Sequence, residues 1–151
     1  MQKITPFLWF DNNAEEAMQF YTSIFKNAKI GNVTHHEGNV ITATFELEGQ
    51  EFMVLNAGPQ FKFNEAISFF VKCDSQEEVD YFWEKLTADG GEESQCGWLK
   101  DKYGLSWQII PNILGELLQN QDPAKAGRAM QAMLQMRKID IAKLREASGQ
   151  S

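Results

Sequence analysis

Gln108 is the side chain whose setting in this sequence best suits the binding of a ligand. It lies in the run 106–110 (Ser-Trp-Gln-Ile-Ile), which predicts a β-strand whose side chains alternate between two faces. Trp107 and Ile109 share the face that suits a helix-covered core, whereas Gln108 shares the other face with Ser106. An amide among apolar neighbours can orient a carbonyl or hydroxyl group, so we expect a ligand site on this second face.

The histidines and cysteines do not suggest a catalytic or metal-binding set. His35 and His36 are adjacent, so on a strand they would point to opposite faces, and we expect them at a solvent-facing hairpin end. We expect Cys73 to be a small core residue on the helix-facing side of a strand, while Cys96 stands at a strand start. The sequence also lacks the motifs of a Ser-His-Asp triad, a phosphate loop or a zinc finger.

Composition excludes several classes of partner. The 151 residues are 43% hydrophobic, which is enough for a genuine core. The formal net charge of -7 argues against nucleic acid and anionic membranes, because both favour a basic surface. No apolar run approaches membrane-spanning length, and the N-terminus does not resemble a secretion signal. With only two cysteines, we expect reduced thiols and a cytoplasmic protein.

The pattern of apolar residues predicts two β-α-β-β-β modules in succession. The first comprises a strand, an amphipathic helix, a hairpin and a further strand, at residues 4–10, 14–25, 31–36, 39–47 and 51–55. The second has the same order, at residues 67–73, 75–88, 92–95, 97–101 and 106–110. Gly104 supplies the positive φ that the turn of the last hairpin requires.

The two predicted helices also match residue for residue. Segment 14–21 (AEEAMQFY) aligns with segment 76–83 (QEEVDYFW), and Phe20 matches Phe82 at the same offset of 62 (82 − 20). The amphipathic period shared by all such helices explains part of this match. The paired glutamates and the aromatic residues at one offset favour a true internal repeat.

These elements predict an α+β protein with a domain over residues 1–111, built from modules 1–56 and 67–111 with a connector at 57–66. Residues 112–151 form a predicted C-terminal helical extension. A methionine-rich face of this extension adapts to irregular surfaces, so it can be a lid over a ligand site or part of a dimer interface, which we favour. The face consists of Met130, Met133, Leu134 and Met136.

Separate segments of the chain resemble one protein family. Residues 4–11 (ITPFLWFD) and 14–17 (AEEA) look like the first module of the PhnB-like branch of the vicinal oxygen chelate superfamily, which includes glyoxalases, bleomycin-resistance proteins and dioxygenases. Residues 97–104 (GWLKDKYG) are similar to the last hairpin of that branch. The resemblance implies two βαβββ modules whose sheets curve into a cup, usually in a homodimer, with a ligand or a metal ion inside.

Many members of this branch are labelled 3-demethylubiquinone-9 3-methyltransferase-like. Methyl transfer from S-adenosylmethionine usually relies on a doubly wound sheet and a glycine-rich first loop. Neither feature is present in this sequence, since no G-x-G run follows a predicted strand. The label therefore does not by itself predict an activity.

In metal-binding members of the superfamily, the ligands come from the first and last strands of each module. The resemblance places Thr5, Met53, Ser68 and Gln108 at these positions. Divalent metal ions prefer imidazole, carboxylate or thiolate ligands, and none of the four side chains offers one. We expect no metal ion and no other cofactor here, although the Gln108 carbonyl oxygen is a weak potential ligand.

The resulting hypothesis is a small-molecule binding protein of the glyoxalase/bleomycin-resistance type that holds an apolar or planar ligand and forms a homodimer. Two alternatives stay open: an enzyme in which Gln108 orients the substrate together with Thr5 or Ser68, and a structural dimer whose cup is filled by its own side chains. The lack of a good general base in the cup favours binding, and no catalytic residue is assigned. The predicted cup residues are Thr5, Phe7, Trp9, Met53, Ser68, Phe70 and Gln108.

Overall fold

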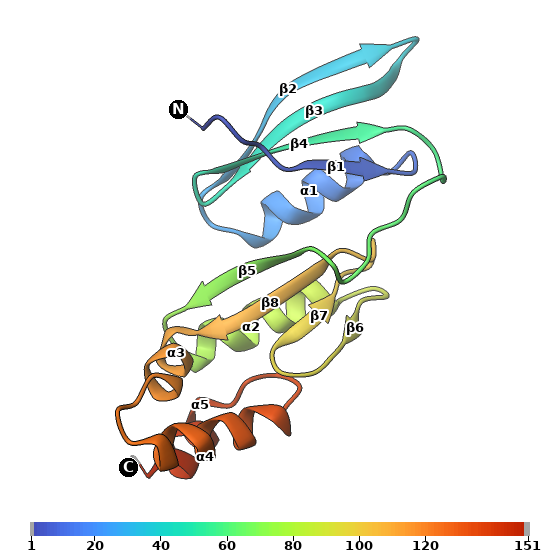
Figure 1. Ribbon diagram of the computed structural model, residues 1–151. Helices are drawn as coiled ribbons and strands as arrows, with labels where there is room; N and C mark the ends of the chain where they lie inside the picture. Colours follow the sequence, from blue (N-terminus) through green and yellow to red (C-terminus); the bar gives the residue numbers. More distant parts are fainter. Residues whose placement is uncertain (1, 150–151) are drawn as a thin grey trace. The chain divides into compact units, whose positions relative to one another are not determined.

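Each half of the chain forms a four-stranded sheet with one helix packed against it (Figure 1). The structure is a computed structural model that describes residues 2–149, and these divide into two units between Lys62 and Phe63. The predicted α+β class and its two βαβββ modules are confirmed. None of the helices in the described residues has the length and apolar character needed to cross a lipid bilayer.

The first unit contains β1 (Phe7–Phe10), α1 (Ala14–Ile24), β2 (Ala28–His36), β3 (Asn39–Leu47) and β4 (Gln50–Asn56). Its strands lie in the order β1-β4-β3-β2, with β1 parallel to β4 and the other neighbours antiparallel. Strand β1 begins three residues later than predicted (7 − 4). Pro6 has no N–H to donate, and only its carbonyl joins the sheet, accepting from the Met53 N–H at 2.9 Å.

Helix α1 is capped by a residue from the far end of its own module. Asn13 occupies the N-cap position, but its side chain makes no capping hydrogen bond. Instead, Asn56 Oδ1 accepts from the Ala14 N–H at 2.9 Å, while Asn56 Nδ2 donates to the Val40 carbonyl at 3.0 Å. One amide therefore ties α1 to β3 and β4.

The second unit repeats this topology with β5 (Ser68–Cys73), α2 (Gln76–Thr87), β6 (Glu92–Glu93), β7 (Trp98–Lys100) and β8 (Ser106–Pro111). Its strand order is β5-β8-β7-β6, again with a parallel first pair. Helix α2 begins at Gln76, one residue after the predicted start, because Ser75 is its N-cap: the Ser75 Oγ accepts from the Glu78 N–H at 3.1 Å. The helix buries Val79, Trp83 and Leu86.

Three helices follow the second sheet: α3 (Asn112–Leu118), α4 (Pro123–Leu134) and α5 (Ile141–Ser148). They build a small core with the end of β8. The buried members are Ile110, Leu114, Leu117, Ala129, Met136, Ile139 and Leu144. The methionine-rich face is only partly buried, because Met130 and Leu134 remain 41% and 47% exposed. On α4, Ala129 is buried in this core and Met133 packs against it.

The segment between α4 and α5 attaches the extension to the second unit. The N–H groups of Cys96 and Gly97 donate to the carbonyls of Met136 and Arg137, each at 2.8 Å. On α2, Gln76 Nε2 donates to the Ile139 carbonyl at 2.9 Å, and Gln76 Oε1 accepts from the backbone N–H of residue 141 at 2.8 Å. The extension therefore docks against α2 and the start of β7, and it leaves the Phe70 side chain exposed.

Candidate functional site

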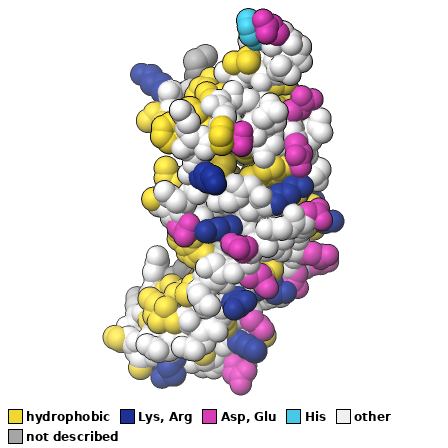
Figure 2. Space-filling view, turned by 90° about the vertical axis from the view of Figure 1, so that its right-hand side faces the viewer, with side chains coloured by type: hydrophobic (Ala, Val, Ile, Leu, Met, Phe, Trp, Pro, Cys, Tyr) yellow, Lys and Arg dark blue, Asp and Glu magenta, His cyan; other side chains and the backbone are white. Residues whose placement is uncertain are grey.

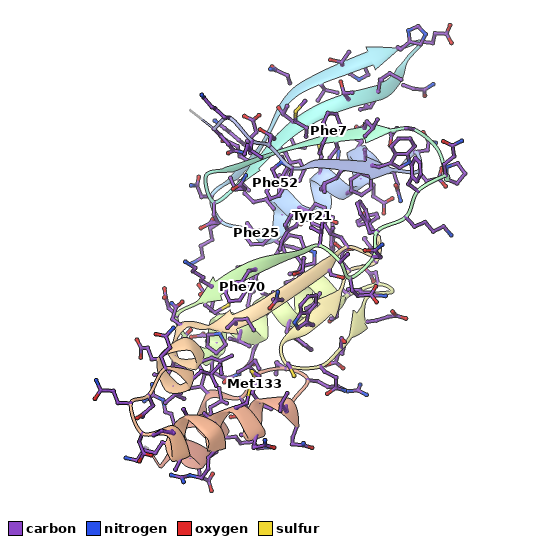
Figure 3. The ribbon with its side chains drawn as sticks, in the orientation of Figure 1. Phe7, Tyr21, Phe25, Phe52, Phe70 and Met133 are labelled. Carbon is purple, nitrogen blue, oxygen red and sulfur yellow. The ribbon has the colours of Figure 1, made fainter. Side chains whose placement is uncertain are left out.

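Each sheet has one face covered by its helix and one face that carries an exposed phenylalanine. Leu8 and Phe10 on β1 are buried, whereas Phe7 on the opposite face is 49% exposed. In the second unit Phe70 is 54% exposed, while its neighbour Phe69 packs edge-to-face against Trp107 at a ring distance of 5.4 Å. Figure 3 labels the two exposed phenylalanine side chains.

The two phenylalanines occupy equivalent positions in their sheets. Phe7 is in register with Met53 on the parallel strand β4, and Phe70 is in register with Gln108 on the parallel strand β8. These two registers make Met53 equivalent to Gln108 (108 − 53 = 55) and Phe7 equivalent to Phe70 (70 − 7 = 63) in the two modules. In both units the helix-free face therefore carries a phenylalanine ring beside an unbranched, flexible side chain, which is Met53 in the first unit and Gln108 in the second.

In the first unit, the connector covers part of the predicted binding surface. Trp9 is half-buried because Phe61 packs edge-to-face against its ring at 4.9 Å. The Trp9 indole N–H donates to the Gly58 carbonyl at 2.9 Å, which fixes the ring orientation. Thr5 precedes β1, and its hydroxyl accepts from Gln2 Nε2 at 3.4 Å.

In the second unit, two of the predicted residues contact each other. Gln108 Nε2 donates a hydrogen bond to Ser68 Oγ at 2.9 Å. Gln108 also lies in register with Trp98 on β7, so aromatic side chains occupy the neighbouring positions on both sides of the amide. The Ser68 contact fixes the orientation of the amide plane on the sheet surface.

Sequence reasoning missed a polar cluster beside Gln108. Lys100 and Ser106 are in register across β7 and β8, and the Lys100 Nζ lies 3.0 Å from Glu65 Oε1. The cavity at this place has a volume of about 180 Å³. Alternation along 106–110 correctly predicts Ser106 on the helix-free face, but no sequence signal connects Lys100 with a glutamate in the connector. The lining residues are Glu65, Glu92, Glu93, Ser94, Trp98, Leu99, Lys100 and Ser106.

The donor chemistry of the described residues does not fit a divalent metal ion. In residues 2–149, no three His, Cys, Asp or Glu side chains gather closely enough to hold one. The four positions implied by the superfamily carry a hydroxyl, a thioether, a hydroxyl and an amide, which are weak ligands. His35 and His36 lie at the tip of the β2–β3 hairpin, where Figure 2 shows histidine beside an acidic side chain.

Cys73 is buried and unsuited to nucleophilic chemistry. Desolvation, reinforced by the nearby carboxylates of Glu78 and Asp74, raises the pKa of its thiol to about 12. The thiol therefore stays protonated at neutral pH, and the thiolate is the reactive form. The predicted role of Cys73 as a small core residue is consistent with this burial.

Two βαβββ units of this kind, each with one helix-free sheet face, define a protein with a glyoxalase-like fold. The sequence profile described as 3-demethylubiquinone-9 3-methyltransferase matches residues 2–110. The chain belongs to this family.

Solved structures support the assignment at two levels. A "putative 3-demethylubiquinone-9 3-methyltransferase, PhnB protein" from Bacillus cereus is 40% identical, with 73% of this chain and 99% of that chain covered and a TM-score of 0.68. The fosfomycin resistance protein FosX from Listeria monocytogenes is 18% identical, with 79% and 98% coverage and a TM-score of 0.57, and therefore supports the fold alone. No curated protein matches the chain.

The match to the family profile ends near the end of β8, so helices α3 to α5 lie outside it. The described sheets also differ from the doubly wound parallel sheet common among S-adenosylmethionine-dependent enzymes, because only the β1–β4 and β5–β8 pairs are parallel. The family description therefore brings no methyltransferase site with it to this chain.

Proposed function

We propose that the protein binds a small apolar or planar molecule on the helix-free faces of its sheets. The observation that carries this proposal is the exposure of Phe7 and Phe70 at equivalent positions, 49% and 54% respectively. A large aromatic side chain gains about 1.5–3 kcal/mol when it is fully buried, so two exposed rings at repeated positions favour an occupant.

The polar groups on these faces suit orientation better than catalysis. Gln108 and Ser68 form a hydrogen-bonded pair that presents an amide to the surface of the second sheet. Neither is a general base at neutral pH, and neither is a strong metal ligand. We therefore propose binding without a catalytic metal ion, through Thr5, Phe7, Trp9 and Met53 on the first unit and Ser68, Phe70 and Gln108 on the second.

A homodimer and a cytoplasmic location are part of the same proposal. The long edge strand β2 is exposed along nearly its whole length, and β6 is an exposed edge of the second sheet. Unpaired strand edges and exposed apolar side chains favour association with a second copy. The two cysteines are free, as is usual for proteins of a reducing compartment.

The test compares two site variants with one matched control. Phe7→Ser and Phe70→Ser remove the proposed contact surfaces, while Ile67→Ser changes a 69% exposed apolar side chain that lies just before β5. Native mass spectrometry of each purified protein measures co-purified small molecules and oligomeric state together. Elemental analysis of the same samples measures bound metal.

We expect wild type and Ile67→Ser to carry the same small-molecule adduct, and both site variants to lose most of it. Loss of the dimer without loss of an adduct would instead favour the structural role of the exposed rings. An adduct that both site variants retain in full would exclude the proposed site. Stoichiometric zinc, nickel, manganese or iron would overturn the metal-free assignment.

A further inference from the structure

The cavity beside Gln108 combines a buried hydroxyl, a cation and an aromatic side chain within the second unit. It has a volume of about 180 Å³, and its lining includes Ser106, Lys100, Trp98 and Glu65. All four belong to the second unit, so the cavity is complete without any other part of the chain. Its volume suits the polar end of a small molecule rather than a whole drug-sized ligand.

The Ser106 hydroxyl is the first observation that indicates a ligand here. The residue is 1% exposed, and its Oγ has no hydrogen-bond partner in the structure. A buried hydroxyl without a partner costs about 1–3 kcal/mol, so such groups are normally satisfied by water or a ligand. Ser106 lines the cavity, and an oxygen atom placed there can satisfy it.

The Lys100–Glu65 ion pair is the second observation, and it indicates the chemistry of the ligand. Glu65 belongs to the connector and not to the sheet, yet its carboxylate lies 3.0 Å from the Lys100 Nζ. The hydrogen bond from Lys100 and its positive charge hold the pKa of Glu65 below its usual value. The Glu65 side chain is 62% exposed, so it can leave without disturbing a packed core.

We propose that this cavity binds the carboxylate of a planar aromatic acid, which displaces Glu65 from Lys100. One carboxylate oxygen accepts from the Lys100 ammonium and the other accepts from the Ser106 hydroxyl, while the ring packs beside Trp98. This assignment rests on the proposed binding function and names the ligand class for the second sheet. Glu65 then acts as a built-in competitor that occupies the cation when no acid is bound.

The other acidic residues of the cavity permit this assignment. Glu93 Oε1 accepts from the Trp83 indole N–H at 2.6 Å, so its carboxylate is directed to the helix-covered side. Glu92 is opposite Lys100 in the β6–β7 pair and is exposed, so solvent screens its charge. Glu65 is therefore the carboxylate that contacts the Lys100 ammonium directly.

Benzoate is a suitable probe, because it contains only the proposed carboxylate and ring. The full-length protein is titrated with benzoate, and the backbone amide and Trp98 indole signals are followed by NMR. Lys100→Gln and Ser106→Ala remove the two proposed donors, and Glu65→Gln removes the competitor. Lys85→Gln and Glu84→Gln on α2 make the same charge changes away from the sheet face.

We expect benzoate to shift the signals of Trp98, Lys100 and Ser106. Glu65→Gln should bind it at least about threefold more tightly, and Lys100→Gln about tenfold more weakly. Ser106→Ala should weaken binding severalfold while its melting temperature stays at or above that of wild type, and the α2 variants should bind like wild type. Equal affinity in Lys100→Gln and Lys85→Gln, or weaker binding in Glu65→Gln, would overturn the proposal.

The same samples separate failure of this inference from failure of the proposed function. If the wild-type protein carries an adduct that Phe70→Ser loses, and benzoate shifts no signals of the cavity, then the proposed binding function stands and the carboxylate ligand is rejected. If benzoate shifts these signals in a way that depends on Lys100, but no adduct depends on Phe7 or Phe70, then the anion cavity stands and the proposed binding on the apolar sheet faces is rejected.

Discussion

The Trp107 indole nitrogen donates a hydrogen bond to Asp101 Oδ2 at 2.9 Å, across the turn that joins β7 to β8. The other carboxylate oxygen, Oδ1, accepts from the backbone N–H groups of Tyr103 and Leu105 at 2.9 and 3.1 Å. Asp101 is only 2% exposed, so these hydrogen bonds replace its hydration. The hairpin that carries the proposed anion cavity is thus organised around one buried carboxylate.

Removing this carboxylate should strongly destabilise the second unit. Asp101→Ala leaves three N–H donors without their present acceptor, and an unsatisfied buried donor costs about 1–3 kcal/mol. We expect a loss of roughly 3 kcal/mol or more in the free energy of unfolding, measured by urea denaturation. Trp107→Phe removes one of the three donors and should cost clearly less. A loss below about 1 kcal/mol for Asp101→Ala would show that solvent replaces the carboxylate.

The helical extension should contribute to stability through its inner face only. Leu144 is fully buried in the cluster of α3, α4 and α5, whereas Leu134 is 47% exposed. We expect Leu144→Ala to cost about 2–5 kcal/mol, because it leaves a cavity, and Leu134→Ala to cost less than about 0.5 kcal/mol. Thermal unfolding of the pair measures the difference. An equal and large loss in both would show that the outer face of α4 is buried against a second copy of the protein.

Several features of the fold follow from the sequence because they depend on local chemistry. Gly104 adopts the positive φ expected of the turn, at 86°, and Ser75, a residue type common at helix N-caps, caps α2. The repeated order of strands and helices is also readable in the sequence, and in the structure it places Phe7 and Phe70 at equivalent positions of the two sheets. Alternation and helical period are sufficient for such predictions.

Other features depend on contacts between distant segments, which local patterns do not encode. Asn56 caps α1 from 42 residues away, and Glu65 in the connector pairs with Lys100 on β7. The helical period of α4 identifies an apolar face, but the neighbours decide that Ala129 is buried while Met130 stays exposed. Sequence reasoning therefore predicted the alternating faces of the strands but missed the charged cavity.

Docking of the extension on α2 should weaken in acid. Hydrogen bonds from Gln76 and Lys138, and the positive charge of Lys138 2.9 Å away, lower the pKa of Asp80. Because the pKa of Asp80 is lower in the folded protein than in the unfolded chain, its ionised carboxylate stabilises the folded state. This stabilisation is fully present above the unfolded pKa, near 3.9, and is lost as the pH falls through the folded pKa. We expect Asp80→Asn to be less stable than wild type at pH 7, with the difference shrinking below about pH 4.

Urea midpoints measured across this pH range provide the test, with Glu84→Gln on the same helix as a control for the general loss of negative charge. Glu84→Gln should not reproduce the convergence with wild type in acid. A difference between wild type and Asp80→Asn that stays constant from pH 7 to below about pH 4 would mean that the carboxylate of Asp80 does not hold the extension.

The two cysteines should differ greatly in reactivity toward iodoacetamide. Cys73 is fully buried, and its thiol pKa is raised to about 12, so at pH 8 only on the order of one thiol in ten thousand is ionised. Cys96 is partly exposed at the start of the last hairpin and should be alkylated first. Mass spectrometry of tryptic peptides measures both rates, with Cys73→Ser and Cys96→Ser as controls. In urea the two rates should converge, because unfolding removes the desolvation that protects Cys73, whereas equal rates in the native protein would contradict its burial.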